Sequence, residues 1–306
     1  MMHRIAHPSL GINGDDADFL RWSLEYLRQR DFNFVTVEDV ARSVRGEISL
    51  PPRSVSFTVD DGYWDQTEVA APIFLEFDCP ATFFVTTGFI DRDIWFWESK
   101  VDYLLSQCSE PLFIRFGGRR RAQGARQMNR QQMAEALKDE LKNLSFTEIE
   151  KKLVEWASDL DVQIPDAAPE KYLPTTWERL VDIQGMGLKV EPHGYRHSIL
   201  SQESEAESRK EIEKSQNDLR ARLGKDSAVF CYPVGREVDF GVREEQAARE
   251  LGFLGAVSAV PGCVNIADRS RLYRMPRYSF PDTKTDLIQY ASWIEVVKSS
   301  VRRRLA

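Results

Sequence analysis

The stretch Ser54-Val55-Ser56-Phe57-Thr58-Val59-Asp60-Asp61-Gly62 carries the most information in this sequence. Its first six residues alternate small polar side chains with β-branched or aromatic ones, which predicts a buried β-strand. Asp60 and Asp61 follow at the end of that strand. In α/β barrels the loops after the strands converge on one face, where the chemistry takes place. A carboxylate pair there can bind a cation with one aspartate and accept a proton with the other, although an isolated Asp-Gly step is usually a turn.

Two histidines far downstream supply ligands of the complementary type. His193 and His197 follow the strand-like stretch 188–191 and Pro192, so His193 also lies at a strand end. A His-x-x-x-His spacing places two imidazoles on one side of a helical turn, but such pairs also occur as surface or core residues. Imidazole and carboxylate suit Zn²⁺ and similar ions, and three protein ligands leave one coordination position open for water. The sequence therefore predicts a metal site with a base beside it.

Composition and charge restrict the class of protein. The 306 residues are 42% hydrophobic, enough for a sizeable core, and the formal net charge of −7 gives no reason to expect nucleic acid as a partner. No apolar run is long enough to span a membrane, and residues 1–16 lack the charged-then-apolar order of a signal peptide. We therefore expect a cytoplasmic enzyme. The four cysteines form no C-x-x-C pair, so we expect reduced thiols rather than a disulfide framework or zinc cluster.

Strand-like and helix-like stretches alternate along the chain, as in βα units. Helices are expected at 16–30, 37–44, 65–76, 204–223 and 243–251, and strands at 33–36, 54–59, 81–86, 188–191 and 253–258, with a further strand that runs into Tyr232. The alternation breaks between residues 91 and 173, where an aromatic cluster, a hairpin through Gly117-Gly118 and charged helices near 131–144 and 147–160 predict an insertion. It resumes at Thr175, which has capping-box spacing to Glu178. We expect one domain, 1–306, that carries the insertion 91–173.

Three motifs in order resemble those of the polysaccharide deacetylases, the family with the NodB-type, carbohydrate esterase family 4-like catalytic domain. They are Ser56-Phe57-Thr58-Val59-Asp60-Asp61-Gly62-Tyr63, His193-Gly194-Tyr195-Arg196-His197-Ser198 and Phe230-Cys231-Tyr232-Pro233-Val234-Gly235. The stretch 79–85 resembles the strand after the first motif, and 272–277 resembles the closing segment of exopolysaccharide-associated members. The similarity covers nearly the whole chain.

The resemblance implies a fold and a set of residue roles. The fold is α/β, a distorted (β/α)7-type barrel with a helical insertion between the first and second motifs. Asp60 would be the catalytic base, and Asp61, His193 and His197 would bind one divalent metal ion, zinc in the first place, with cobalt, nickel or manganese as alternatives. The third motif would form a groove wall in which Tyr232 and Pro233 contact the substrate and the N–H of Tyr232 stabilises the oxyanion.

The expected general acid is the one clear departure. Most of the family has a late Leu-x-His motif, but no histidine follows His197 here. In a branch resembling the poly-N-acetylglucosamine deacetylases this histidine lies on the first strand, and Met2-His3-Arg4-Ile5 aligns with that step. His3 is therefore the predicted acid. The alternatives are that His3 is a frayed terminal residue and that His7, beside Pro8, takes the role.

Further side chains are candidates for contact with substrate. Tyr63 belongs to the first motif. Trp97, with Trp95, has the aromatic face that covers a pyranose ring, although packing of the insertion on the barrel is the alternative. Arg277, with Arg274, would bind a substrate phosphate or brace the aspartates, and a solvated arginine is the third interpretation.

We therefore predict a metal-dependent hydrolase that removes an N-acetyl or similar acyl group from an amino sugar, in surface polysaccharide or glycan-precursor metabolism. Two other functions stay open. One is hydrolysis of a small non-sugar amide, a formamide or cyclic ureide, which a closed pocket in place of an open groove would favour. The other is a catalytically silent carbohydrate-binding relative, suggested by the missing late histidine.

Overall fold

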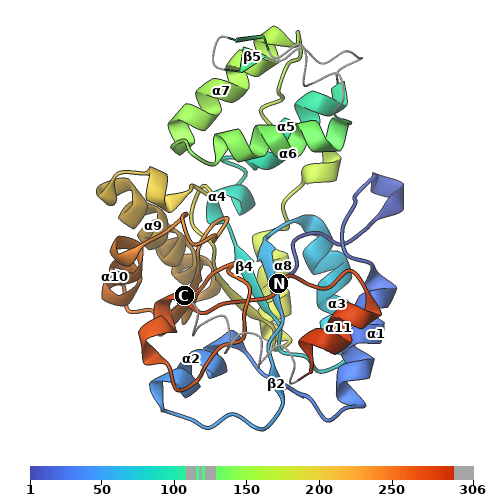
Figure 1. The fold of residues 1–306 in the computed structure, drawn as a ribbon, viewed down its shortest axis with the longest axis vertical. Coiled ribbons are helices and arrows are strands. Elements are labelled where there is room, and N and C mark those ends of the chain that lie inside the picture. The colour runs from blue at the N-terminus through green and yellow to red at the C-terminus, as the bar shows by residue number, and fades with distance from the viewer. Residues whose placement is uncertain (108–114, 117–118, 121–128, 293–306) are drawn as a thin grey trace.

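Short parallel strands form the centre of the molecule in the computed structural model, which describes residues 1–107, 115–116, 119–120 and 129–292 (Figure 1). The strands β3 (Thr58–Asp61), β4 (Thr82–Val85) and β7 (Lys189–Pro192) pair in that order. A second pair joins β8 (Val229–Cys231) to β9 (Gly255–Val257), and a third joins β1 (Asn33–Phe34) to β2 (Ser54–Val55). All three sets are parallel, as βα units require.

Two end segments of the chain join β3, β4, β7, β8 and β9 in a distorted (β/α)7 barrel. Met2 bridges in parallel to Val59 of β3, and Met275 bridges in parallel to Val257 of β9. The N–H of Phe280 then donates to the Met1 carbonyl at 2.7 Å, so the last segment lies beside the first. The order around the barrel is the Met2 segment, β3, β4, β7, β8, β9 and the Met275 segment.

The barrel is distorted between β7 and β8. Within the described residues no strand pairing joins these two strands. Instead, the buried Glu191 carboxylate of β7 accepts hydrogen bonds from the N–H groups of Ala228 at 2.8 Å and Val229 at 3.3 Å. The Glu191 side chain thus accepts from backbone N–H groups that would pair with a neighbouring strand in a regular sheet.

Two apolar layers surround the strands. One contains α1 (Ala17–Arg28), α3 (Ala71–Glu76) and α8 (Trp177–Gly185), and the other contains α2 (Val37–Arg45), α9 (Glu205–Leu223) and α10 (Val242–Glu250). The body also contains α4 (Thr87–Ile90) and α11 (Lys284–Tyr290). The α9 helix begins at the cap Ser204 and ends at Gly224, whose φ of 70° is a conformation that glycine adopts without strain.

Three helices between the first two motifs form a helical layer of their own. Figure 1 shows α5 (Trp97–Gln107), α6 (Arg130–Leu141) and α7 (Phe146–Asp159) stacked beyond α4, away from the strands of the body. They share an apolar core that includes Trp97, Leu137 and Trp156. The strands β5 (Arg115–Phe116) and β6 (Arg119–Arg120) pair antiparallel, as the predicted hairpin requires, while Gly117-Gly118 lies outside the described residues.

Three local predictions were wrong in detail. The run 54–59 is not one strand, because the chain leaves β2 after Val55 and joins the barrel as β3 only at Thr58, so both aspartates lie within the strand. The helix predicted over 65–76 begins as a π-helical turn, Gln66–Ala70, before α3. The cap of α8 is Thr176, which accepts from the Arg179 N–H at 3.3 Å, because the hydroxyl of Thr175 bonds to Thr67 instead.

A membrane span is not found. Within the described residues, every helix is too short or too polar to cross a lipid bilayer.

Candidate active site

The carboxyl end of β3 places the two aspartates. Asp61 has φ of 97° and Gly62 has φ of 99°, so the strand ends in an abrupt turn. The side-chain amide of Gln66 holds this turn, because its oxygen accepts from the Gly62 N–H at 3.0 Å and its nitrogen donates to the carbonyls of Asp60 and His3. A non-glycine residue with such a φ costs about 1–3 kcal/mol and persists where the surrounding structure holds it, as Gln66 does here.

The segment that carries the histidines is a loop and not the predicted helical turn. Gly194 has φ of 79° and His197 has φ of 57°, and these two residues fold the loop back on itself. The carbonyls of Gly194 and Tyr195 accept hydrogen bonds from the first residues of α4, Thr87 and Gly88. Both imidazoles are buried as a result.

Three ligand atoms converge at the barrel mouth. Asp61 Oδ1 lies 3.7 Å from Nε2 of His193 and 3.7 Å from Nε2 of His197. Tetrahedral Zn²⁺ with bonds of about 2.1 Å holds its ligand atoms about 3.4 Å apart, so this arrangement fits a divalent ion. The predicted ligands Asp61, His193 and His197 are therefore brought together.

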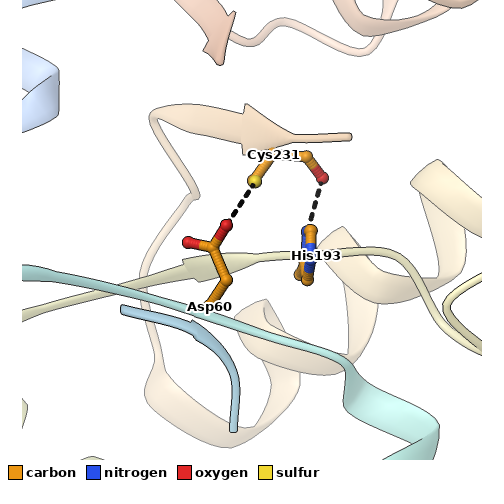
Figure 2. A group of neighbouring side chains, drawn as sticks. All are labelled: Asp60, His193 and Cys231. Atoms are coloured by element: carbon orange, nitrogen blue, oxygen red, sulfur yellow. Dashed lines mark hydrogen bonds between the residues drawn. The ribbon is translucent and has the colours of Figure 1, made fainter. Parts of the chain in front are cut away.

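The opposite nitrogen of His193 is fixed by the third motif. Its Nδ1 lies 2.9 Å from the Cys231 carbonyl, as Figure 2 shows. A carbonyl can only accept, so the proton resides on Nδ1 and the Nε2 lone pair faces Asp61. Burial lowers the pKa of His193 to about 3, which keeps the ring neutral as a ligand must be.

Asp60 is held by an arginine from the far end of the chain. Arg277 donates from Nη1 to Oδ1 at 2.8 Å and from Nη2 to Oδ2 at 2.7 Å, and both side chains are buried. Burial alone would raise the pKa of Asp60, but the Arg277 charge and its hydrogen bonds outweigh burial and hold that pKa well below its usual range. Asp60 is therefore an ionised carboxylate at neutral pH.

Arg277 was predicted either to contact the substrate or to brace the aspartates. Besides Asp60, the guanidinium donates to Thr58 Oγ1 and to the Ser258 carbonyl, both at 2.9 Å, and it lies 3.1 Å from Cys231 Sγ. All of these partners belong to the protein. The alternative interpretation, that Arg277 braces an aspartate, is the one that the structure shows, while Arg274 pairs with Glu245.

A second group of ligand types, Asp60, His193 and Cys231, lies beside the first (Figure 2). Cys231 Sγ is 3.5 Å from Asp60 Oδ2. However, Asp60 already neutralises Arg277, and the Nδ1 of His193 is directed at the Cys231 carbonyl. A cation here would face the buried Arg277 charge, so this group is the poorer metal site.

A cavity of about 260 Å³ collects most of the predicted residues. Its lining comprises Met1, His3, Asp60, Asp61, Tyr63, Phe96, Glu98, Glu135, Lys138, Lys142, His193, His197, Tyr232 and Val234. His3 is exposed to it and follows Met2, whose backbone pairs with β3, so the chain at His3 is not frayed. His7, the alternative acid, packs edge-on against Trp64 and is not a lining residue.

Two predicted substrate contacts lie elsewhere. Trp97 is 1% exposed and belongs to the core of the insertion, so the packing interpretation holds for it in this structure. Trp95 is likewise buried, in an aromatic cluster with Tyr172. Pro233 is buried and packs close to Gly194: a Cβ added to Gly194 would lie only 3.1 Å from Pro233 Cγ. Pro233 therefore supports the loop that carries the two histidines.

The predicted oxyanion donor is already engaged. The Tyr232 N–H donates to the Val257 carbonyl at 3.2 Å, and its hydroxyl donates to the Tyr273 carbonyl at 2.9 Å. Val234, two residues later, lines the cavity with φ of 59°, and among the described residues its N–H has no acceptor. The amide of Val234 is therefore the better candidate. Tyr63 does line the cavity, with its hydroxyl 2.7 Å from Ser99 Oγ.

Sequence reasoning missed the contribution of the insertion. Its first helix supplies Glu98, and α6 with the residue after it supplies Glu135, Lys138 and Lys142 to the cavity wall. The only signal for Glu98 was a carboxylate directly after the aromatic cluster 95–97. For the α6 residues the sequence held no signal beyond a charged helix face.

Comparison with known proteins identifies the family. The profile of the polysaccharide deacetylase family matches residues 47–256, a range that includes both aspartates, both histidines and Val234. The chain belongs to the polysaccharide deacetylase family. A comparison with curated proteins finds no match.

Solved structures show the same fold at low sequence identity. The deacetylase PplD of Streptococcus pyogenes, in complex with acetate, is 17% identical with a TM-score of 0.62, and the match covers 94% of each chain. IcaB from Ammonifex degensii is 16% identical with a TM-score of 0.58, over 96% of this chain and 94% of that one. The BpsB deacetylase domain from Bordetella bronchiseptica is 18% identical with a TM-score of 0.53, over 83% and 81%.

These comparisons confirm the resemblance drawn from the three motifs and the distorted (β/α)7 barrel. A member of this family is a carbohydrate deacetylase, so the chain is a hydrolase that acts on polysaccharide.

Proposed function

We propose that this polysaccharide deacetylase is a metal-dependent N-deacetylase that removes an acetyl or similar acyl group from an amino sugar, in surface polysaccharide or glycan-precursor metabolism. The observation that carries the proposal is the convergence of Asp61 Oδ1 with two imidazole Nε2 atoms at 3.7 Å, in a cavity that also contains Asp60 and His3.

The ligand set fits one divalent ion held by Asp61, His193 and His197, with zinc preferred by two imidazoles and a carboxylate. When bound, such an ion would lower the pKa of a coordinated water to roughly 7 and would polarise the amide carbonyl. The chain's own residues supply the remaining functions.

Asp60 would accept a proton from the attacking water as the water adds to the amide carbon. Arg277 keeps this carboxylate ionised and fixes its orientation through two hydrogen bonds. Because the pKa of Asp60 is depressed, Asp60 is a weak base, and it suits a water whose own pKa is lowered by a bound ion.

The oxyanion would accept a hydrogen bond from the Val234 N–H, which has no protein acceptor in the described chain. Losing one such donor typically raises the barrier by about 2.7–4 kcal/mol. His3, exposed on the cavity wall, would then protonate the departing amine.

The cavity size favours one sugar residue at a time. Its volume of about 260 Å³ lies just below the usual range of small-molecule sites, roughly 300–1,000 Å³. Glu98 and Glu135 of the insertion form one side of the cavity wall. Because the cavity is small and walled on this side, the small non-sugar amide stays a second candidate substrate. Family membership favours the sugar.

Acetate release from N-acetylglucosamine oligosaccharides tests the proposal, with a formamide and a cyclic ureide as competing substrates. We expect activity on the sugar that a chelator abolishes and zinc restores. Asp60→Asn should keep the metal yet lose roughly 10²–10⁴-fold in rate, whereas Asp61→Asn should also lose metal affinity. If the two variants behave alike in both properties, the assigned division between base and ligand is wrong.

The acid is tested by a substrate comparison. His3→Ala should strongly depress hydrolysis of the acetamido sugar but spare an activated aryl acetate ester, whose leaving group needs little proton assistance. His7→Ala is the matched control and should spare both. Equal loss on both substrates, or no loss on either, would remove His3 from the mechanism.

A further inference from the structure

The first turn of α5 contacts the candidate metal site although it belongs to the insertion. The ring of Phe96, just before the helix, meets His197 edge-on with centroids 4.9 Å apart. Glu98 Oε1 lies 3.3 Å from His197 Nδ1. Ser99 Oγ lies 2.7 Å from the Tyr63 hydroxyl. Three neighbouring residues of the insertion therefore touch groups of the first and second motifs.

The two histidines differ in what their Nδ1 atoms meet. His193 has the Cys231 carbonyl as an acceptor at 2.9 Å. His197 has no backbone acceptor, and its buried Nδ1 makes no hydrogen bond within the described residues, nor does the buried Glu98 Oε2. The Glu98 carboxylate lies beside His197 Nδ1, with Oε1 3.3 Å away, which is within reach of a hydrogen bond once the angle is favourable.

The unpaired Nδ1 of His197 and the Glu98 carboxylate lie next to each other, which indicates one interaction. An N–H on Nδ1 of His197 would find its acceptor in Glu98 and would leave the Nε2 lone pair facing Asp61, 3.7 Å away. The same arrangement already holds for His193. A carboxylate that accepts the second N–H of a metal-binding histidine fixes its tautomer and ring orientation and raises its basicity.

We propose that Glu98 is a positioning residue that fixes the Nδ1–H tautomer and the orientation of His197, so that the insertion completes the metal site. This inference rests on the proposed function, because it takes Asp61, His193 and His197 as the metal ligands. It assigns the helical layer a direct part in metal affinity and not only in shaping the cavity wall.

Zinc affinity of the chelator-stripped protein is the first test, measured by competition with a chelating dye at one pH. Loss of such a partner typically weakens metal binding 10–100-fold. We expect Glu98→Ala to fall in that range and Glu98→Gln, which keeps an acceptor but not the charge, to weaken binding less. The matched control is Glu155→Gln, an exposed glutamate on α7 of the same helical layer that pairs with Lys152, and it should bind zinc with wild-type affinity. Zinc binding by Glu98→Ala at wild-type affinity would overturn the proposal.

The tautomer of His197 in the metal-free protein is the second test, and it does not depend on the metal. In ¹⁵N-histidine spectra we expect wild-type His197 to be protonated on Nδ1, and we expect Glu98→Ala to shift it toward the Nε2–H form. An identical tautomer in both proteins would overturn the inference even if the protein binds zinc. Failure of wild type to bind zinc would instead contradict the proposed function, and the spectra would still decide the role of Glu98.

Discussion

Replacing Arg277 with methionine removes the charge partner of the proposed base and keeps only an unbranched stem as long as that of arginine up to Nε. The Arg277 and Asp60 side chains are only 8% and 2% exposed, and two hydrogen bonds of 2.8 and 2.7 Å join them. Breaking a buried ion pair on one side leaves an uncompensated charge and costs about 3–5 kcal/mol. We expect Arg277→Met to lose that much unfolding free energy in urea at pH 7.

The pH dependence of this loss follows from the direction of the pKa shift. The folded-state pKa of Asp60 is depressed, so the pair contributes stability above the unfolded pKa, which is lost only as pH falls through the folded value. Without Arg277, burial dominates and raises the pKa of Asp60. The acid limb of the rate profile should therefore move to higher pH in Arg277→Met, and Arg274→Gln, whose partner is Glu245, should leave it unchanged.

A double-mutant cycle decides whether the two residues act as a pair. Asp60→Asn alone leaves the Arg277 charge buried, so it too should destabilise the protein. The double variant removes both charges, and its loss should be smaller than the sum of the single losses by about 1.5–3 kcal/mol. Losses that add within about 0.5 kcal/mol, or an unshifted acid limb, would refute the reasoning.

Two further predictions concern the strands that carry the site. Burial raises the pKa of Glu191 from 4.5 to about 7, so the folded protein holds this proton more tightly than the unfolded chain. The unfolding free energy of the protein should therefore fall by about 3 kcal/mol as pH rises across that interval. Urea titrations at pH 5 and 8 measure this difference. Glu191→Gln should abolish it, whereas Glu213→Gln, at an exposed glutamate, should retain it. Gly62→Ala should cost more stability than Gly187→Ala, because both have φ near 100° but only at Gly62 does an added Cβ meet a neighbour, Ile90 Cδ1 at 2.8 Å. Equal thermal shifts for the two alanine variants would show that strain, and not steric contact, sets the cost.

The parts of the site that sequence reasoning predicted are those fixed locally. Asp60 and Asp61 end an apolar strand, and His193 follows another, so strand ends and residue chemistry were enough to identify them. Alternation of side chains did not show that the run 54–59 contains a change of strand partner, because Val55 and Thr58 satisfy the same pattern in different sheets.

The parts that were left open or missed depend on contacts across the fold. Arg277 meets Asp60 across 217 positions of sequence, and Glu98 reaches His197 from a separate helical layer. No local pattern encodes such pairings. Trp97 was misassigned for a related reason, since an aromatic residue that stacks on a sugar and one that fills a core look the same in sequence.

The metal content of the reconstituted protein tests the central claim most directly. Chelator-stripped wild type, supplied with zinc and passed through a desalting column, should retain one ion per chain. The variant with both His193→Ala and His197→Ala should retain none, with its folding checked by circular dichroism. Full zinc content in that folded double variant would contradict the assignment of Asp61, His193 and His197 as the metal site, and with it the proposed mechanism.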